Sequence, residues 1–231
     1  MFARVLVPQS AARIIQGMIL TGEFKRGEKL PSQRDLSLSL KVSRASLREA
    51  LLTLETLGLL RTEPGRGTFV SEQGPSASSN MARWRYADSY SVVDVFQTRL
   101  MLEGQIASLS AASLSADDID DLAQATDEME RYWAAGDLLS NVESDLRFHG
   151  IIASACGNRM LVDLYQSVRN QITETQRQPI PITEPARMSD SIAEHRRIVE
   201  TMRARDGAAA QLAMEAHIRN TARCAGVILR P

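Results

Sequence analysis

The sequence predicts a mainly α-helical chain of two domains: a small N-terminal unit of three helices followed by a β-hairpin, and a larger C-terminal bundle of antiparallel helices. The first observation is a polar stretch at residues 71–80, which contains glycine and proline but almost no apolar side chains and is typical of a linker. The second is a strand-turn-strand pattern directly before it, and the third is a helical repeat of apolar residues that continues after it. We therefore expect domains at residues 1–72 and 83–231, joined by a linker at residues 73–82.

Length and composition restrict the class of protein. The chain has 231 residues, of which 44% are hydrophobic and 24% charged, so it can form two hydrophobic cores and is neither disordered nor fibrous in composition. It lacks an apolar run of roughly 18 residues and an N-terminal secretion signal, which indicates a cytoplasmic location and no membrane partner. The two cysteines, Cys156 and Cys224, are far apart in sequence and are expected as small buried residues rather than as a disulfide or a thiolate metal site.

Charge is distributed unevenly between the two parts. Residues 1–72 contain 11 basic and 7 acidic side chains, a net charge of +4, whereas the rest of the chain contains 16 basic and 21 acidic side chains, a net charge of −5. The asymmetry points to an anionic partner for the first part, although a solvated basic face is the commoner explanation for so small an excess.

Three helices are expected before the hairpin. The first covers residues 9–21. The second begins after Ser32, whose side chain can cap it, and ends near residue 40. The third begins after Ser43, presents a continuous apolar stripe and ends at Gly58.

Two short strands follow, at residues 59–62 and 68–70, and a glycine-rich turn with Arg66 at its tip joins them. Two helices joined by a tight turn and followed by a hairpin form a winged helix-turn-helix, which is a DNA-binding fold. Arg44 and Arg48 lie four residues apart on one face, near the start of the third helix, where an arginine can bind guanine in the major groove.

Other residues of this unit are suited to the DNA backbone. Ser43 and Ser46 can contact phosphate, and Arg66 can reach the backbone or the minor groove from the hairpin tip. For any single arginine a solvated basic face remains an alternative. The combination with the whole fold pattern favours a DNA-binding surface.

Polar residues interrupt the apolar stripes of the second domain. Asp145 and His149 occupy core positions of a helical stripe whose steps are 3 or 4 residues. His195 and His217 interrupt two later stripes in the same way. Because every histidine of the chain lies on an inward stripe, we expect one carboxylate and three imidazoles to converge inside the bundle.

The spacing of the last two histidines supports this convergence. His195 precedes Asp206 by 11 residues and His217 follows it by 11, and Asp206-Gly207 is the expected turn of a helical hairpin. Both imidazoles then lie at one level, about 16 Å from the turn. An aspartate and three histidines without a thiolate suit a divalent transition metal, zinc above all, with nickel or manganese as alternatives.

The alternative is that each histidine is a core residue whose ring is satisfied by a hydrogen bond. For a lone histidine this interpretation is the better one. Burial of four such groups without partners carries a large energetic cost, and metal coordination removes that penalty. The set as a whole therefore favours a metal site.

A charged residue also interrupts the first stripe of the bundle, which runs from Val92 to Leu109 and includes Arg99. One interpretation is a structural ion pair with Glu103, one helical turn away. The other is a clamp for the carboxylate of a small ligand whose other oxygens reach the metal. The sequence leaves both open. Asn170 is a weaker candidate for a polar contact to the ligand, because it lies off the stripe of its own helix.

The chain resembles the GntR family of bacterial regulators, specifically its FadR-type branch with a C-terminal FCD ligand-binding domain. In the first domain the resemblance rests on GEKLPSQRDLS, VSRASLREALLTLETLGLL and PGRGTFV. It implies that Arg34, Arg44, Arg48 and Gly65 contact DNA and that Ser46 assists.

In the second domain the resemblance rests on RLMLE, DLRFH, EHRRIVE and AMEAH, and it implies that Asp145, His149, His195 and His217 are metal ligands. It also implies an all-helical effector domain of six or seven helices and a homodimer. The operator is then a short inverted repeat in double-stranded DNA, and the effector is a small organic acid.

One expected function and two alternatives follow. We expect a transcriptional regulator, not an enzyme, whose operator binding responds to a small acid bound at the metal. The first alternative is the same regulator with a purely structural metal. The second is a metalloenzyme that uses the metal to activate water, which lacks an obvious additional acid or base beside the ligands.

Overall fold

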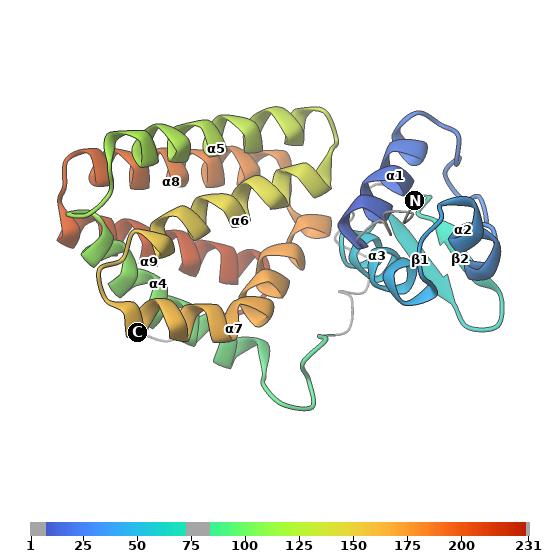
Figure 1. The fold of residues 1–231 in the computed structure, drawn as a ribbon, viewed down its shortest axis with the longest axis horizontal. Helices are drawn as coiled ribbons and strands as arrows, with labels where there is room; N and C mark the ends of the chain where they lie inside the picture. Colours follow the sequence, from blue (N-terminus) through green and yellow to red (C-terminus); the bar gives the residue numbers. More distant parts are fainter. Residues whose placement is uncertain (1–7, 73–83, 230–231) are drawn as a thin grey trace, which may run out of the picture. The chain divides into compact units, whose positions relative to one another are not determined.

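The computed structural model describes residues 8–72 and 84–229, and the linker expected at residues 73–82 lies outside them. The chain divides into two compact units, residues 1–82 and 83–231. Both are built mainly of α-helices, which confirms the predicted fold class (Figure 1).

The N-terminal unit begins with three helices, α1 (Pro8–Leu20), α2 (Gln33–Ser39) and α3 (Arg44–Thr56). Both expected caps are present, because Ser32 Oγ and Ser43 Oγ each accept a hydrogen bond from a backbone N–H in the first turn of the following helix. Buried apolar side chains of α1 and α3 pack against each other and form the core of this unit. Helices α2 and α3, with the tight turn between them, form the predicted helix-turn-helix.

The wing is a hairpin of β1 (Leu60–Glu63) and β2 (Gly67–Val70), which pair antiparallel. An additional bridge joins Lys29 to Phe69 of β2, and backbone hydrogen bonds of 2.8 Å flank it. The segment at residues 22–31, between α1 and α2, thus adds a second short pairing to the wing. No alternation of apolar residues marks this pairing, because the contact is made by backbone groups.

The C-terminal unit contains six α-helices and one 3-10 helix among residues 84–229, in agreement with the expected six or seven helices. Ser91 and Ser115 begin two of these helices with complete capping boxes. The elements in order are α4 (Val92–Ser110), α5 (Ala116–Ala134), α6 (Leu138–Ser154), α7 (Arg159–Arg177), η1 (Ile180–Ile182), α8 (Pro185–Arg203) and α9 (Gly207–Cys224).

The helices pack as a bundle in which α4 lies against α7 and α9, α5 against α6 and α8, and α8 against α9 (Figure 1). Asp206 caps α9, so the predicted α8–α9 hairpin is confirmed. A Cβ atom at Gly207 would lie 2.6 Å from the carbonyl oxygen of Ser108. Only glycine therefore permits the start of α9 to approach the end of α4 this closely.

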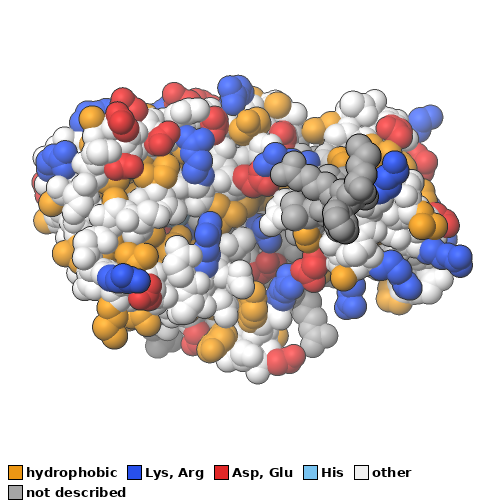
Figure 2. Space-filling model, viewed as in Figure 1, with side chains coloured by type: hydrophobic (Ala, Val, Ile, Leu, Met, Phe, Trp, Pro, Cys, Tyr) orange, Lys and Arg blue, Asp and Glu red, His pale blue; other side chains and the backbone are white. Residues whose placement is uncertain are grey.

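The surface and the interior differ in the polar residues they carry. Charged side chains are spread over the viewed face, whereas the three histidines are at most 3% exposed and do not show on it (Figure 2). Cys156 is buried as expected, but Cys224 is only half-buried because it lines a cavity. No helix in the described residues is long and apolar enough to cross a membrane.

Candidate functional site

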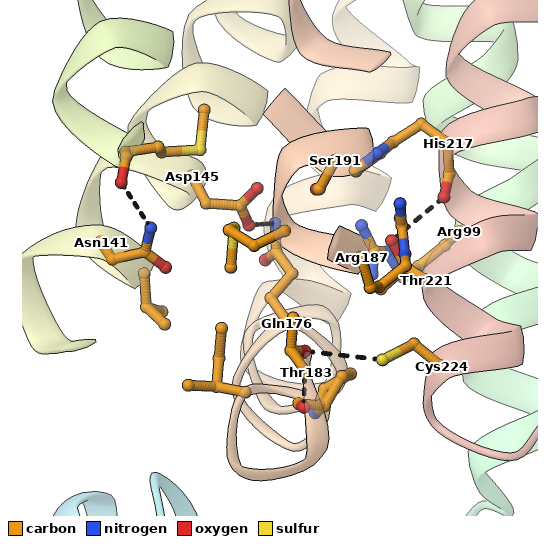
Figure 3. A pocket seen from close by; sticks show the side chains of 15 residues that line it. Arg99, Asn141, Asp145, Gln176, Thr183, Arg187, Ser191, His217, Thr221 and Cys224 are labelled. Carbon is orange, nitrogen blue, oxygen red and sulfur yellow. Dashed lines mark hydrogen bonds between the residues drawn. The ribbon is translucent and has the colours of Figure 1, made fainter. Parts of the chain in front are cut away.

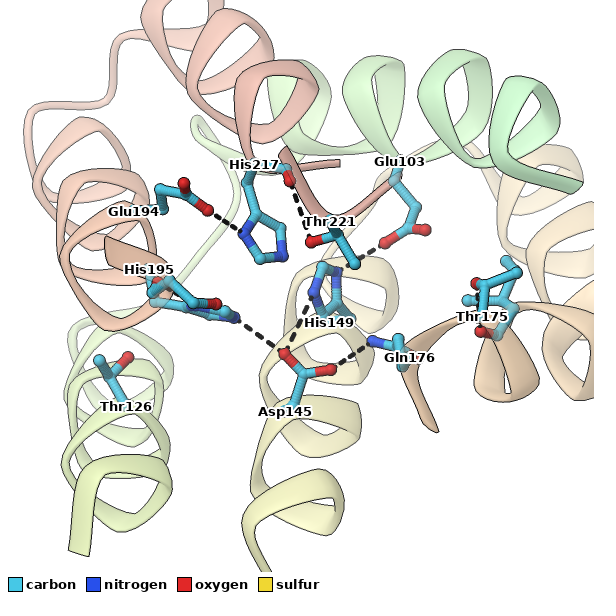
Figure 4. A network of polar contacts seen from close by, with 12 residues as sticks. Glu103, Thr126, Asp145, His149, Thr175, Gln176, Glu194, His195, His217 and Thr221 are labelled. Carbon is cyan, nitrogen blue, oxygen red and sulfur yellow. Dashed lines mark hydrogen bonds and ion pairs between the residues drawn. The ribbon is translucent and has the colours of Figure 1, made fainter. Parts of the chain in front are cut away.

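The four predicted metal ligands converge inside the bundle (Figure 4). Asp145 and His149 come from α6, His195 from α8 and His217 from α9, and one ligand atom of each lies within 4.8 Å of the others. Asp145 and His149 reach the same point because a spacing of four residues places them on one face of α6.

The α8–α9 hairpin brings His195 and His217 together, as their equal spacing from the turn predicts. Their ring centroids lie 4.4 Å apart in an edge-to-face arrangement. His149 joins them from α6, with its centroid 5.5 Å from that of His217 and 5.9 Å from that of His195. Three imidazoles from three helices therefore surround one point.

Hydrogen bonds to the outer ring nitrogen orient two of these imidazoles. His195 Nδ1 donates to the Ser191 carbonyl oxygen at 2.7 Å, and His217 Nδ1 donates to Glu194 Oε2 at 2.8 Å. Because these oxygens accept, the proton lies on Nδ1, and the neutral ring then has its lone pair on Nε2. Acceptors in this position fix the tautomer and orientation of metal-binding histidines.

Glu103 lies against the third imidazole, that of His149, at a short distance but without hydrogen-bond geometry. Its Oε2 lies 2.6 Å from His149 Nδ1, and its Oε1 accepts a hydrogen bond from Arg99 Nε at 2.7 Å. Burial raises the pKa of Glu103, but Arg99 and His149 outweigh burial and lower the pKa to about 2. Glu103 is therefore ionised and links Arg99 to a predicted metal ligand.

The charge state of the cluster suits a cation. Burial, together with the neighbouring His195, lowers the pKa of His217 to about 4, so this imidazole is neutral near pH 7. Burial raises the pKa of Asp145, yet its contact with His195 and the nearby His149 hold it well below its usual range. A neutral imidazole and an ionised carboxylate are the forms that bind metals.

Two further observations fit a metal ion among these residues. His149 Nε2 is buried and has no hydrogen-bond partner in the described part of the chain. His195 Nε2 faces Asp145 Oδ1 at 3.0 Å although its ring proton lies on Nδ1, so two lone pairs meet unless a proton or a metal cation lies between them. Imidazole nitrogens with a carboxylate oxygen form a donor set that zinc, nickel and manganese accept.

A cavity of about 50 Å³ adjoins the cluster, and Asp145, His217 and Arg99 are among the residues that line it (Figure 3). This volume accommodates a few water molecules or a small polar group. Arg99 is fully buried; its Nη1 donates to Thr175 Oγ1 at 3.1 Å, and its Nη2 has no hydrogen-bond partner among the described residues. Arg99 thus forms the structural ion pair with Glu103 and still has a donor left, so its two interpretations are compatible.

The structure does not bring Asn170 to the cavity. Asn170 is exposed on α7 and is not among the lining residues, whereas Gln176 of the same helix is. Gln176 Nε2 donates to Asp145 Oδ2 at 2.7 Å, and its Oε1 has no partner among the described residues. The buried stripe that contains Ile172 continues by a step of four residues to Gln176, so extending the stripe would have found it.

The predicted DNA-contacting arginines are exposed. Arg34 lies on α2, and Arg44 and Arg48 lie in the first turns of α3. None of the three forms an ion pair within the described residues. Their guanidinium groups are therefore available to an external anion.

The other predicted DNA contacts differ in their surroundings. Ser46 is half-buried, and its hydroxyl accepts a hydrogen bond from Ser43 Oγ at 2.9 Å. Gly65 is exposed at the tip of the wing with a φ of 74°, a left-handed conformation that favours glycine. Arg66 is exposed and pairs with Glu63, so it must exchange this partner for phosphate in order to bind DNA.

Sequence patterns missed two polar residues of α8 near the cluster. Glu194 accepts the His217 hydrogen bond, and Arg187 donates to both Glu194 oxygens, at 3.0 and 2.9 Å. Arg187, Ser191 and Glu194 follow one another by steps of 4 and 3 residues, beside the apolar stripe of the same helix. This polar stripe is the signal that could have found them.

Comparison with known proteins agrees with both domains. Residues 8–70 match the family model of the bacterial regulatory proteins of the gntR family, and residues 94–220 match that of the FCD domain. The chain belongs to the GntR family. The Uxu operon transcriptional regulator of Escherichia coli (strain K12) is 29% identical, over 92% of this chain and 84% of its own length. The HTH-type transcriptional regulator LutR of Bacillus subtilis (strain 168) is 32% identical, over 88% of this chain and 94% of its own length.

Solved structures share the fold. The chain is similar to E. coli McbR/YncC with a TM-score of 0.52 and 17% identity, over 93% of this chain and 94% of that chain. A putative GntR transcriptional regulator from Rhodococcus sp. RHA1 gives a TM-score of 0.51 and 18% identity, over 96% of this chain and 99% of that chain. This GntR-family chain is a transcriptional regulator with a winged helix-turn-helix and an FCD domain, as its motifs predict.

Proposed function

We propose that this GntR-family regulator binds a divalent metal through Asp145, His149, His195 and His217, and that a small organic acid held between the metal and Arg99 controls its binding to an operator. One observation carries the proposal. Three buried imidazoles, two with acceptors at Nδ1 and the third against Glu103, meet one carboxylate, beside a cavity lined by an arginine whose Nη2 has no partner among the described residues.

Each part of the site has a distinct role in this proposal. Zinc is the metal we expect first, with nickel or manganese as alternatives. The metal would supply a Lewis-acidic contact to an oxygen of the acid. Glu194 and the Ser191 carbonyl orient two of the rings, Glu103 lies against the third, and Arg99 offers a charge-assisted hydrogen bond to the carboxylate.

In the other domain we propose that α3 enters the major groove and the wing lies against the backbone or in the minor groove. A homodimer would present two such units to the two halves of a short inverted repeat. An exposed, unpaired guanidinium at the start of α3 is suited to a base edge, and the wing tip to phosphate. The proposed contacts are Arg34, Arg44, Ser46, Arg48, Gly65 and Arg66.

Control of DNA binding requires that the acid prefer one arrangement of the helices. Arg99 lies on α4, the first helix after the linker region, and Glu103 of the same helix contacts His149 of α6. A ligand that draws Arg99 and the metal cluster together therefore acts on the helix nearest the DNA-binding domain in sequence.

The test uses full-length protein and an operator selected from a random duplex library. The double variant His195→Ala/His217→Ala should lose bound metal, measured by plasma mass spectrometry, and should lose the effect of a panel of small acids on operator binding. Arg196→Ala is the matched control, because Arg196 is exposed next to His195 and pairs with Glu130 at the surface. An unchanged response to acids in the double variant would overturn the sensing role.

A second variant separates sensing from a purely structural metal. Arg99→Met should keep the metal and lose the response to the acid. If no acid of the panel changes operator binding by the wild-type protein while the metal remains bound, the metal is structural and the sensing proposal fails.

A further inference from the structure

Two arginines line the cavity beside the metal cluster, Arg99 from α4 and Arg187 from α8 (Figure 3). Asp145 is the one carboxylate among its described lining residues. Each arginine is paired with a carboxylate that does not line the cavity, Glu103 or Glu194. The guanidinium groups therefore line the cavity while their charges are balanced from behind, so an anion in the cavity would rely on their remaining N–H donors and on the charge of the metal.

Arg187 can bind a second anion without releasing its first. It donates to Glu194 through Nη1 and Nη2, at 3.0 and 2.9 Å. The same carboxylate also accepts hydrogen bonds from His217 Nδ1 at 2.8 Å and from Asn220 Nδ2 at 2.7 Å, so its oxygens are fully used. A guanidinium has about five N–H donors, and the pairing with Glu194 occupies only part of them.

Arg187 also stands where the cavity meets a larger space. The inner cavity has a volume of about 50 Å³, whereas an open groove of about 670 Å³ lies beyond it, and Arg187 and Cys224 line both. The groove is also lined by Arg197 and Arg223, neither of which forms an ion pair within the described residues. Asp190 and Glu194 line the groove as well, so its described lining has three basic and two acidic side chains. A ligand longer than the inner cavity would extend past Arg187 toward this groove.

We propose that Arg187 binds a second acidic group of the effector, so that the acid recognised is a small dicarboxylate. One carboxylate lies at Arg99 and the metal, and the other lies at Arg187, at the mouth of the cavity. The inference rests on the proposed function, because it requires the first carboxylate at Arg99. Arginine suits this position because its planar fork matches a carboxylate with paired hydrogen bonds.

This arrangement makes Arg187 the residue that selects between acids. A monocarboxylate of equal length would place an apolar end against a guanidinium and would gain no charge-assisted hydrogen bond there. A dicarboxylate gains one or two such bonds. The pairing with Glu194 already stabilises the partly buried guanidinium of Arg187, so the acid needs to offset less of the free energy of desolvation.

The test is a calorimetric titration of metal-loaded, full-length protein with straight-chain monocarboxylates and α,ω-dicarboxylates matched in chain length. The best dicarboxylate should bind the wild-type protein at least about tenfold more tightly than its matched monocarboxylate. Arg187→Met should remove this preference; metal content and monocarboxylate affinity are measured in the same variant, because Arg187 also pairs with Glu194, which orients His217.

Two further variants keep the result decisive. Arg197→Met is the matched control, because Arg197 lines the groove and not the inner cavity, and it should retain the preference. Arg187→Lys keeps a positive charge against Glu194 and provides the same test if the Met variant loads metal poorly. It should lower the preference, because an ammonium group lacks the fork.

Failure of this inference differs from failure of the proposed function. If monocarboxylates bind and Arg99→Met abolishes their binding, but dicarboxylates gain nothing in the wild-type protein, only the Arg187 site is wrong. Equal weakening of both acids by Arg187→Met, or loss of the preference in Arg197→Met, also overturns it. If neither class binds the metal-loaded wild-type protein, both proposals fail.

Discussion

The arginines proposed to bind DNA in one domain and the acid in the other lie in opposite surroundings. In the N-terminal domain, Arg34, Arg44 and Arg48 are exposed and form no ion pair within the described residues. In the C-terminal domain, Arg99 is fully buried and donates to Glu103 at 2.7 Å. The first three guanidinium groups are available to an external partner, whereas that of Arg99 is used within its own network.

This difference has an energetic basis. Water solvates an exposed guanidinium, so it needs no partner in the chain, whereas a buried one is costly unless carboxylates and hydrogen-bond acceptors surround it. Replacing an exposed arginine should therefore change binding to a partner, and replacing the buried one should change folding. The predictions below test that division.

Metal removal should have the largest effect, and it should be confined to the C-terminal domain. A metal present at about ten thousand times its dissociation constant stabilises the folded state by about 5.5 kcal/mol, because the unfolded chain does not hold the ligands together. Dialysis against a chelator should accelerate hydrogen exchange, measured by mass spectrometry, in α6, α8 and α9. Exchange in α1 to α3 should stay the same, and His217→Ala should reproduce the pattern without a chelator. Equal loss of protection in α3 would contradict the division.

Arg99→Met should lower the free energy of unfolding of the C-terminal domain by about 3–5 kcal/mol, because it leaves Glu103 buried without its cation. Arg44→Met, the same replacement at an exposed site, should change the free energy of unfolding by less than about 0.5 kcal/mol. Denaturant unfolding of both variants without metal makes the comparison. The double variant Arg99→Met/Glu103→Leu should recover much of the lost free energy of unfolding, because it removes the unpaired carboxylate. If the double variant is no more stable than Arg99→Met, the unpaired Glu103 is not the cause of the loss.

Arg44→Ala should weaken operator binding by about 1–3 kcal/mol and relax the preference at one base pair, if Arg44 reads guanine. Fluorescence anisotropy with operator duplexes changed at single positions measures both quantities. If Arg44 contacts phosphate instead, the variant should bind every duplex more weakly by the same factor. The slope of the logarithm of the binding constant against the logarithm of salt concentration should then decrease by about one. Arg196→Ala in the other domain should change neither.

The two pairs within the cluster of Asp145 and the three histidines could be predicted from sequence because helical geometry determines each pair. A spacing of four residues puts Asp145 and His149 on one face, and equal spacing from a turn puts His195 and His217 at one level. The polar stripe of α8 marks Glu194 as a candidate, but its contact with His217 could not be predicted, because it depends on how α8 and α9 are rotated against each other. That rotation is set by packing across the whole bundle.

Stripe patterns also lose accuracy at the ends of long helices. Leu109, the last residue of the inward stripe predicted on α4, is 45% exposed. A stripe with alternating steps of three and four residues has a period near 3.5, and it drifts around a straight helix by about 20° per seven residues. Arg99, near the middle of the stripe, is buried as predicted. The wing pairing at Lys29 could not be predicted, because it depends on backbone contacts alone.

Two turns with the same backbone conformation offer the smallest contrast between the domains. Lys41, between α2 and α3, and Arg205, between α8 and α9, both have a φ of 54°. This left-handed conformation costs a non-glycine residue about 1–2 kcal/mol. Glycine relieves the strain, but the greater freedom of the unfolded chain offsets about 0.5–1 kcal/mol of that gain, and the remainder should be the same at both turns because their φ angles are equal.

Arg205 and Lys41 have the same backbone conformation, but their side chains differ in the hydrogen bonds they form. Arg205 Nη1 donates to the carbonyl oxygens of Ala111 and Ala112 at the end of α4, at 3.4 and 3.0 Å, whereas the Lys41 side chain forms no hydrogen bond within the described residues. Arg205→Gly should therefore cost about 0.5–1.5 kcal/mol more than Lys41→Gly in the free energy of unfolding. Denaturant unfolding of the two variants measures the difference. Equal effects would mean that the exposed Arg205 contact adds nothing to stability, and that the contrast between the domains rests on their buried groups alone.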